Sequence, residues 1–572
     1  MKLIMKYKEY LIITTIALLF LIPQLFYHSM IVGYDWWFHW SRFYEAAMQI
    51  KNSTFNYFQS IYAFNQTGRI INAMYGADFA YLHGLLLLIV KSWLKAEIIS
   101  GFLCIMVAGF SMFKLVRYCR ASKSIALFCA ILFMATPPIV LYIQDQSFPG
   151  WASAFLPLCF IPAIRMIETD KKQINPIFFG GSVALLMSIH TFTTLLYVLA
   201  IIPFWIVGVV RSKERMRLIL DSFLSVIVAL SLAANSFFSM LELRTDSLVM
   251  PFPVYDLVSK GSYFSSGMMS RYDFGLIFSF LLIITVILGT TFFTRLSIVN
   301  RMILFVGTLF LVISLRYFPW NSLAKIFPVL AGLQFPQRFT AISNVLLILL
   351  CGLFAMKFGE KLKGDWHKIF LSILIATAFL SCFWGVNSIM VKAQDWQNDK
   401  LTMDGERLIE NPNVVRSKFR ESDLSEAFKT LRKSIPDYLP QYGEVQDPYQ
   451  EYSEQIYENS NVVEKSINSK NQLVLTWYSD KKSEVTQLPI FVYQNSTVMM
   501  NGRRLTKGAY DQSNIGTLVV KSKAGKNSVV VGYEPTNLFK AGIVLKLITI
   551  PSFIVYVVVH FLRNRRLNNV ER

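Results

Sequence analysis

Acidic residues are scarce in this chain, and histidine and cysteine are scarcer still. Its 572 residues include 36 Asp and Glu, 6 His and 6 Cys, against 56 Lys and Arg. All six cysteines lie within or at the ends of apolar runs, and the long polar segment 392–540 has none. This distribution excludes a disulfide framework. The sequence also lacks the C-x-x-C or Cys/His spacing of a structural zinc site.

Charged residues of both signs make up only 16% of the chain, whereas 54% of its residues are hydrophobic. Apolar runs of about 20 residues recur, and a helix of that length spans about 30 Å of hydrocarbon. The net charge of +20 does not indicate a nucleic-acid partner, because the basic residues concentrate at the ends of these runs. The sequence therefore predicts a polytopic α-helical membrane protein of the cell membrane.

The apolar runs and the basic clusters together predict about 12 transmembrane helices, with both termini in the cytoplasm. Residues 79–94 are expected to lie at the outer interface or to re-enter the membrane, because a full span there would reverse the sidedness of the next basic cluster. The predicted spans are 11–32, 96–117, 124–143, 151–168, 176–192, 193–210, 217–240, 274–294, 301–318, 338–357, 368–391 and 541–562.

Three regions follow from this topology. Residues 1–391 form a transmembrane domain whose first outer loop is 33–95, and residues 541–572 form the last helix with a basic cytoplasmic tail. Residues 392–540 lie outside the membrane. They contain short alternating apolar runs, and Asn501–Gly502 is a hairpin-turn signal between two of them. We expect a small extracytoplasmic β-rich domain of the sandwich type.

Polar side chains gather at the outer ends of the predicted helices. This placement favours a surface enzyme over an ion-coupled transporter, which would carry its carboxylates in mid-span or in broken helices. The candidate site residues are Asp35, His39, Arg42, Arg69, Asp78, His83, Asp145, His190, Arg271, Gln334 and Arg338.

Sugar transfer from a lipid-phosphate donor is the chemistry that suits these residues. Asp35 is the candidate general base, since a carboxylate can accept the proton of an acceptor hydroxyl group. Helical spacing places His39, the second candidate catalytic residue, and Arg42 on the face of Asp35, with the neighbouring aromatic rings turned toward lipid. Arg338, Arg271 and Arg42 are candidate ligands of the donor phosphate, because arginine offsets the charge that develops on it.

Ordinary structural roles remain open for the same residues. The tryptophans of the first loop can be anchors of the interfacial aromatic belt. Asp35 can cap the N-terminus of the helix that follows it. His190 can be a hydrogen-bonded helix residue, and Arg338 can extend to the outer headgroups.

Four motifs, in order along nearly the whole chain, resemble those of a known group of bacterial membrane proteins. "GYDWWFHWSRFYEAAMQI" (33–50) resembles the D-x-x-x-H-x-x-R segment of proteins labelled "6-pyruvoyl-tetrahydropterin synthase-related". "SIHTFT" (188–193) matches their histidine in a middle helix. "LQFPQRF" (333–339) resembles their Q-F-P-W-R motif, with Gln337 replacing tryptophan. Residues 488–505 and 516–533 resemble their outer β-domain. This group is similar to YfhO-like proteins and to the GT-C glycosyltransferases.

The resemblance implies a GT-C-like fold and an inverting glycosyltransferase. Such enzymes take the sugar from a polyprenyl phosphate, and their first-loop aspartate, the base, corresponds to Asp35. The acceptor would be a cell-envelope polymer or glycolipid on the outer face. Some members also bind a divalent metal, Mg or Mn, through an acidic residue of the next outer loop, which makes Asp145 a possible ligand.

Other functions remain open beside this one. The alternatives are a non-enzymatic transporter of envelope lipid or polysaccharide, and a glycan-binding accessory protein. A polysaccharide polymerase or ligase would share many of the same features and differ mainly in its donor.

Overall fold

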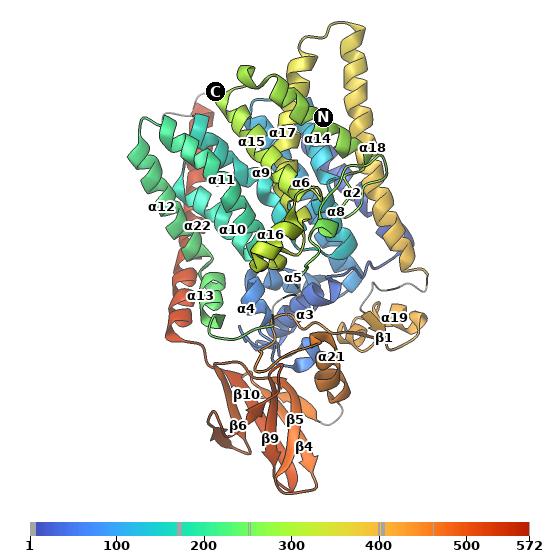
Figure 1. The fold of residues 1–572 in the computed structure, drawn as a ribbon, viewed down its shortest axis with the longest axis vertical. Helices are drawn as coiled ribbons and strands as arrows, with labels where there is room; N and C mark the ends of the chain where they lie inside the picture. Colours follow the sequence, from blue (N-terminus) through green and yellow to red (C-terminus); the bar gives the residue numbers. More distant parts are fainter. Residues whose placement is uncertain are drawn as a thin grey trace.

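A bundle of helices forms one part of the molecule and a β-rich domain the other (Figure 1). This computed structural model describes residues 7–168, 174–249, 251, 253–398, 401, 406–460 and 463–570. The main bundle helices are α2 (Lys8–Tyr27), α6 (Trp93–Tyr118), α7 (Lys123–Met134), α8 (Pro137–Asp145), α9 (Pro149–Glu168), α10 (Pro176–Ile189), α11 (Thr191–Arg211), α12 (Arg215–Leu232), α13 (Ala234–Leu243), α14 (Gly275–Thr291), α15 (Ile298–Ser314), α17 (Thr340–Gly359), α18 (Asp365–Asp395) and α22 (Asn537–Val570).

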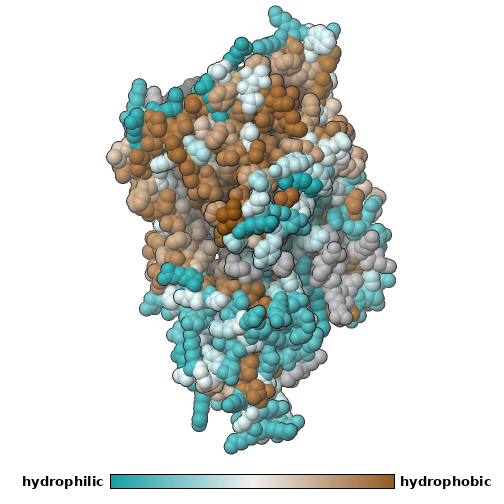
Figure 2. Space-filling view, in the orientation of Figure 1, coloured by the Kyte–Doolittle hydropathy of each residue, from teal (hydrophilic) through white to brown (hydrophobic). Residues whose placement is uncertain are grey.

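Apolar side chains cover the visible face of the bundle, and polar side chains cover the β-rich domain (Figure 2). Within the described ranges, seven helices are long and apolar enough to cross a membrane, or up to nine if each of two bent pairs is one span. The polytopic helical class is thus confirmed.

The predicted count of about 12 spans is wrong, and the reason is helix length. Three of the predicted spans correspond to α10, α14 and α15, which have only 14, 17 and 17 residues. At about 1.5 Å per residue they are about 21 to 26 Å long, which is less than the hydrocarbon thickness of about 30 Å. The segment predicted to lie at the interface, near 79–94, becomes a 14-residue helix, α5 (Ala77–Val90).

A layer of shorter elements lies between the bundle and the β-rich domain (Figure 1). It contains α3 (Trp36–Asn52), η1 (Phe64–Gln66), α4 (Ile71–Tyr75) and α5. The short elements η2 (Val258–Lys260), α16 (Trp320–Ile326), η4 (Pro328–Leu333) and η5 (Pro336–Phe339) connect bundle helices, and η3 (Phe293–Arg295) lies between α14 and α15.

The tryptophans of the first loop are buried in protein. Trp36 is 0% exposed and Trp40 is 1% exposed, and both rings lie beside Trp93, at 5.4 and 5.9 Å between centroids. The expectation that these rings face lipid, and the alternative that they form an interfacial belt, are therefore both wrong. Helical periodicity shows which face of a helix is apolar, but it does not show whether lipid or protein covers that face.

The β-rich domain contains two antiparallel sheets around one core, and β1 and β2 form a separate two-stranded antiparallel sheet. One sheet has the order β3-β4-β10-β6-β7 and the other β5-β9-β8. The Asn501–Gly502 turn joins β6 to β7 with φ of 49° and 80°, so the predicted hairpin is confirmed. The strands are β1 (Glu406–Leu408), β2 (Leu431–Lys433), β3 (Glu464–Ile467), β4 (Leu473–Ser479), β5 (Glu484–Phe491), β6 (Ser496–Met500), β7 (Arg503–Leu505), β8 (Asp511–Gln512), β9 (Thr517–Ser522) and β10 (Gly525–Tyr533).

Short helices α19 (Pro412–Lys418), α20 (Ser425–Phe428) and α21 (Pro448–Tyr452), with the π-helix η6 (Ser453–Glu458), complete this domain. Its docking to the bundle uses polar contacts. Glu242 of α13 accepts hydrogen bonds from Asn495 Nδ2 at 2.8 Å and Thr536 N at 3.0 Å. The start of α2 and the end of α22 lie at the opposite end of the bundle (Figure 1). Residues 1–6 and 571–572, the predicted cytoplasmic ends, lie outside the described residues.

Candidate functional site

Two segments at the β-domain end of the bundle are joined by hydrogen bonds from backbone N–H groups of the first loop. Asp35 N donates to the carbonyl oxygen of Asp145 at 2.9 Å, and Gly33 N donates to Gln146 Oε1 at 2.8 Å. Glycine is needed at position 33, because a Cβ there would lie 2.3 Å from Asp145 Cα. The structure thus brings together two predicted site residues, Asp35 and Asp145, from distant parts of the sequence.

The side chain of Asp35 makes no hydrogen bond or ion pair with any residue in the described ranges. It is half-buried and holds the N-cap position of α3, yet it accepts no capping hydrogen bond. The capping alternative for Asp35 is therefore wrong. Burial raises the pKa of the Asp35 carboxyl, and the positive charges of Arg271, Lys433 and Arg338 oppose that rise.

Arg271 is the cation that pairs with Asp145. Its Nη1 lies 3.8 Å from Asp145 Oδ2, and the arginine side chain is 23% exposed. The guanidinium carbon lies 5.5 Å from the ring centroids of both Tyr34 and Phe335. Its Nε is buried and has no hydrogen-bond partner among the described residues. Arg271 therefore holds one buried donor that no described protein group satisfies.

Arg338 is the second arginine of the candidate site. It lies in η5, directly before α17. It donates from Nη1 to the Leu333 carbonyl and from Nη2 to Gln334 Oε1, each at 3.2 Å. Its guanidinium carbon lies 5.0 Å from the Phe335 ring centroid, so both arginines share this ring. Gln334 has a φ of 60°, a strained conformation for a residue with a side chain.

His39 and Arg42 share one face of α3, as their spacing predicted, but they lie in the protein interior. His39 is 3% exposed and stacks on Phe148 at 4.6 Å, and its Nδ1 lies 3.1 Å from Arg42 Nη1. Arg42 also donates to Asn72 Oδ1 at 3.0 Å and to the Gly76 carbonyl at 2.9 Å. Burial and the Arg42 charge lower the pKa of His39 well below its usual range, so its ring is neutral.

Both histidines of the bundle interior have structural partners. His83 Nε2 lies 2.7 Å from Ser100 Oγ, and its Nδ1 lies 2.9 Å from the Phe79 carbonyl oxygen. His190 caps α11, where its Nδ1 accepts a hydrogen bond from Thr193 N at 3.2 Å. These contacts match the ordinary structural role that remained open for His190.

Asp78 and Arg69 are also held by protein groups. Asp78 pairs with Lys546 of α22 and accepts a hydrogen bond from Asn235 Nδ2 at 3.1 Å. Arg69 is 0% exposed and donates from Nη2 to the Asp437 carbonyl at 2.6 Å. The side chain of Asp78 is therefore paired, whereas Nε and Nη1 of Arg69 are buried without a hydrogen-bond partner among the described residues.

Asp145 was the possible metal ligand. No group of three or more His, Cys, Asp or Glu side chains that could hold a metal ion occurs in the part of the chain that the structure describes. The charged side chain that pairs with Asp145 is Arg271, a cation.

Sequence reasoning missed Glu97, which fixes the start of the first loop. Its carboxylate accepts hydrogen bonds from Gln24 Nε2 at 2.6 Å, Ile31 N at 2.9 Å and Trp36 Nε1 at 3.2 Å. The residue is 4% exposed. An acid in the first turns of an apolar helix, directly after the polar loop, was the available signal.

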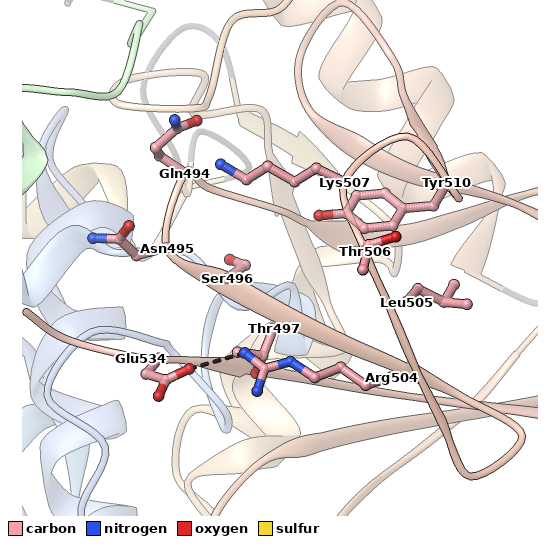
Figure 3. A pocket seen from close by; sticks show the side chains of 10 residues that line it. All are labelled: Gln494, Asn495, Ser496, Thr497, Arg504, Leu505, Thr506, Lys507, Tyr510 and Glu534. Atoms are coloured by element: carbon pink, nitrogen blue, oxygen red, sulfur yellow. Dashed lines mark hydrogen bonds and ion pairs between the residues drawn. The ribbon is translucent and has the colours of Figure 1, made fainter.

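A separate pocket of about 380 Å³ lies on the β-rich domain, and none of the predicted site residues lines it. Its walls carry amide, hydroxyl and charged side chains, with Arg504 paired to Glu534 at 3.0 Å (Figure 3). The lining residues are Gln494, Asn495, Ser496, Thr497, Arg504, Leu505, Thr506, Lys507, Tyr510 and Glu534.

The fold and this geometry define a helical membrane protein with a β-rich domain and a polar site at the junction of the two. Comparison with protein-family models and with curated protein sequences gives no match for the chain. The resemblance to the YfhO-like group therefore rests on the sequence motifs and stays a prediction.

Proposed function

We propose that this protein is a membrane glycosyltransferase that moves a sugar from a polyprenyl-phosphate donor to a glycan or lipid of the cell envelope. The observation that carries the proposal is the Asp35 carboxylate. It is half-buried, has no protein partner in the described ranges, and lies in the field of Arg271, Arg338 and Lys433. A free carboxylate beside cations, at the end of an apolar bundle, suits a proton acceptor next to a phosphate.

Each group then has a defined role in an inverting transfer. The acceptor oxygen forms a bond to the anomeric carbon while the bond from that carbon to the phosphate oxygen breaks. The acceptor proton passes to Asp35, and the electron pair leaves with the lipid phosphate. Arg271 and Arg338 stabilise the departing phosphate, because guanidinium groups donate charge-assisted hydrogen bonds to its oxygens. The apolar helices beside the site accommodate the lipid tail.

The transport alternative draws on one observation, the ion pair between Lys546 and Asp78. Lys546 is 8% exposed and lies in a candidate membrane span, and intramembrane charges often mark ion pathways. Asn235 completes this pair from both sides, donating to Asp78 and accepting from Lys546 at 2.5 Å. A satisfied pair of this kind supports the anchoring of α22 to α5 and α13, so we keep glycosyl transfer as the proposal.

Binding of a lipid phosphodiester to the purified protein in nanodiscs tests the proposal. The probe is farnesyl methyl phosphate, which has the single charge of a polyprenyl-phosphate sugar, and farnesol is its uncharged control. We expect the phosphodiester to bind at least about tenfold more tightly than farnesol. Arg271→Ala and Arg338→Ala should each weaken its binding about 10- to 100-fold, the value of a charge-assisted hydrogen bond.

Arg504→Ala is the matched control, because this exposed arginine pairs with Glu534 on the β-rich domain. Its phosphodiester affinity should equal that of the wild type. Circular dichroism confirms that each variant is folded. Equal binding of farnesol and the phosphodiester to the wild-type protein, or unchanged binding in both site variants, contradicts the proposal.

A further inference from the structure

The connector that follows β2 runs from the β-rich domain into the site. Lys433 Nζ donates to the Tyr34 carbonyl at 2.6 Å, directly beside Asp35 in the sequence. Four residues later, the Asp437 carbonyl accepts the hydrogen bond from Arg69 at 2.6 Å. The connector is therefore held against the first loop at both of its ends.

The backbone at Tyr438 fixes the position of Asp437. Tyr438 has a φ of 63°, a conformation that residues with side chains rarely adopt. Its carbonyl accepts a hydrogen bond from Tyr493 Oη at 3.2 Å, and its ring lies edge-on to Tyr75 at 5.9 Å. Strained backbone of this kind persists where surrounding contacts impose it, and it concentrates at functional sites.

The Asp437 carboxylate, like that of Asp35, has no hydrogen bond or ion pair within the described ranges. It is half-buried. Burial raises the pKa of Asp437 to about 6, the negative charge of Asp35 adds to the rise, and Arg69 and Lys433 oppose it. Burial raises the pKa of Tyr75, Tyr438 and Tyr449, and the negative charge of Asp437 adds to each rise.

The contact between Lys433 and the Tyr34 carbonyl thus brings together two chain segments that each carry a carboxylate without a protein partner in the described ranges: Asp35 follows Tyr34, and Asp437 lies four residues after Lys433. We propose that Asp437 is a second carboxylate of the substrate site and accepts hydrogen bonds from hydroxyl groups of the bound sugar. An ionised carboxylate offers only acceptors, and a sugar offers several donors. This inference rests on the proposed function, and it makes the docked β-rich domain part of the site.

The test compares a sugar-bearing probe with one that lacks the sugar. The probes are the glucosyl, galactosyl, mannosyl and N-acetylglucosaminyl diesters of farnesyl phosphate, and farnesyl methyl phosphate is the reference. The measured quantity is the preference, the affinity for the tightest-binding sugar diester divided by that for the methyl diester. Asp437→Ala is the variant, since a carboxylate that bonds no protein group leaves none unsatisfied when it is removed.

We expect the wild-type protein to prefer one sugar diester, and Asp437→Ala to reduce that preference about five- to tenfold. Asp480→Ala is the control, because Asp480 is exposed in the turn between β4 and β5, and it should keep the full preference. A wild-type protein without any sugar preference, or Asp437→Ala with the wild-type preference, overturns this inference. Wild-type protein that binds no phosphodiester better than farnesol overturns the proposed function instead.

Discussion

The backbone N–H of Asp35 donates a hydrogen bond of 2.9 Å to the carbonyl oxygen of Asp145. This contact joins the first loop to the end of α8 without using either carboxylate. The side chain of Asp145 faces Arg271, while that of Asp35 stays without a protein partner in the described ranges. Main-chain atoms therefore hold the site together, and the Asp35 side chain is free for chemistry.

Asp35→Asn tests the role of the free carboxylate. Asparagine keeps the size of the side chain and cannot accept a proton, and removal of a general base costs about 100- to 10,000-fold in rate. We expect a folded variant with that loss in sugar transfer to an envelope acceptor. Because Asp35 accepts no capping bond, a damaged helix start cannot explain the loss. Turnover within about twofold of the wild type excludes Asp35 as the base.

Gly33→Ala tests the junction of the two loops. A Cβ at position 33 would lie 2.3 Å from Asp145 Cα and 2.5 Å from the Gln144 carbonyl, so the loops must separate. We expect phosphodiester binding to weaken about tenfold or more, since a site displaced by about 1 Å can lose a factor of about 100. Isothermal titration of farnesyl methyl phosphate measures the change.

Gly332→Ala is the matched control for this substitution. It lies near the site in η4, and a Cβ there meets no atom within 4 Å. Its phosphodiester affinity should equal that of the wild type. Equal weakening in both variants would point to a general effect of the methyl group rather than to the loop junction.

The sequence singled out Asp35, Asp145, Arg271 and Arg338, which the structure places near one another, but it did not single out Asp437. These four residues stand at the ends of apolar runs, so a common end of the helices could be predicted for them. Asp437 stands in a polar connector without periodicity. Its approach to Asp35 depends on how the β-rich domain docks, which no local pattern in the chain specifies.

The fold was predictable where a local signal was strong. Alternating runs and the Asn501–Gly502 turn predicted the β-rich domain and its hairpin. The number of spans was not, because hydropathy shows neither where an apolar helix ends short of a full span nor where it breaks. α7 and α8 are bent by 41° at a break just before Pro137, and α12 and α13 are bent by 75°.

Glu97→Ala should destabilise the protein by at least about 3 kcal/mol. The substitution leaves the Gln24 amide, the Ile31 N–H and the Trp36 N–H without their shared acceptor, and each buried donor costs about 1–3 kcal/mol. Glu97→Gln keeps one acceptor oxygen and should lose less. Chemical unfolding in detergent micelles measures the free energy, and exposed Glu360→Ala, within about 0.5 kcal/mol of the wild type, is the control. If Glu97→Ala is as stable as the wild type, the three hydrogen bonds that Glu97 accepts do not stabilise the fold.

Lys465 of β3 should make the stability of the β-rich domain depend on pH. Its Nζ donates to the carbonyls of Asn65, Gln66 and Pro489 at 2.7, 3.2 and 2.9 Å, with no carboxylate among these partners. Burial lowers the pKa of Lys465 to about 7. In an unfolded chain the pKa of lysine is about 10.4.

Between about pH 7 and pH 10, the unfolded chain therefore binds a proton at Lys465 that the folded protein does not. Stability rises with pH wherever the unfolded state binds more protons, so this group makes unfolding less favourable as the pH increases through that window. Lys465→Met should remove this part of the slope, and exposed Lys470→Met should keep it. Unfolding free energies in detergent, measured from about pH 6.5 to pH 9.5, give the slopes. If the wild type and Lys465→Met follow parallel curves, Lys465 keeps its proton in the folded protein, and its contact with η1 does not respond to pH.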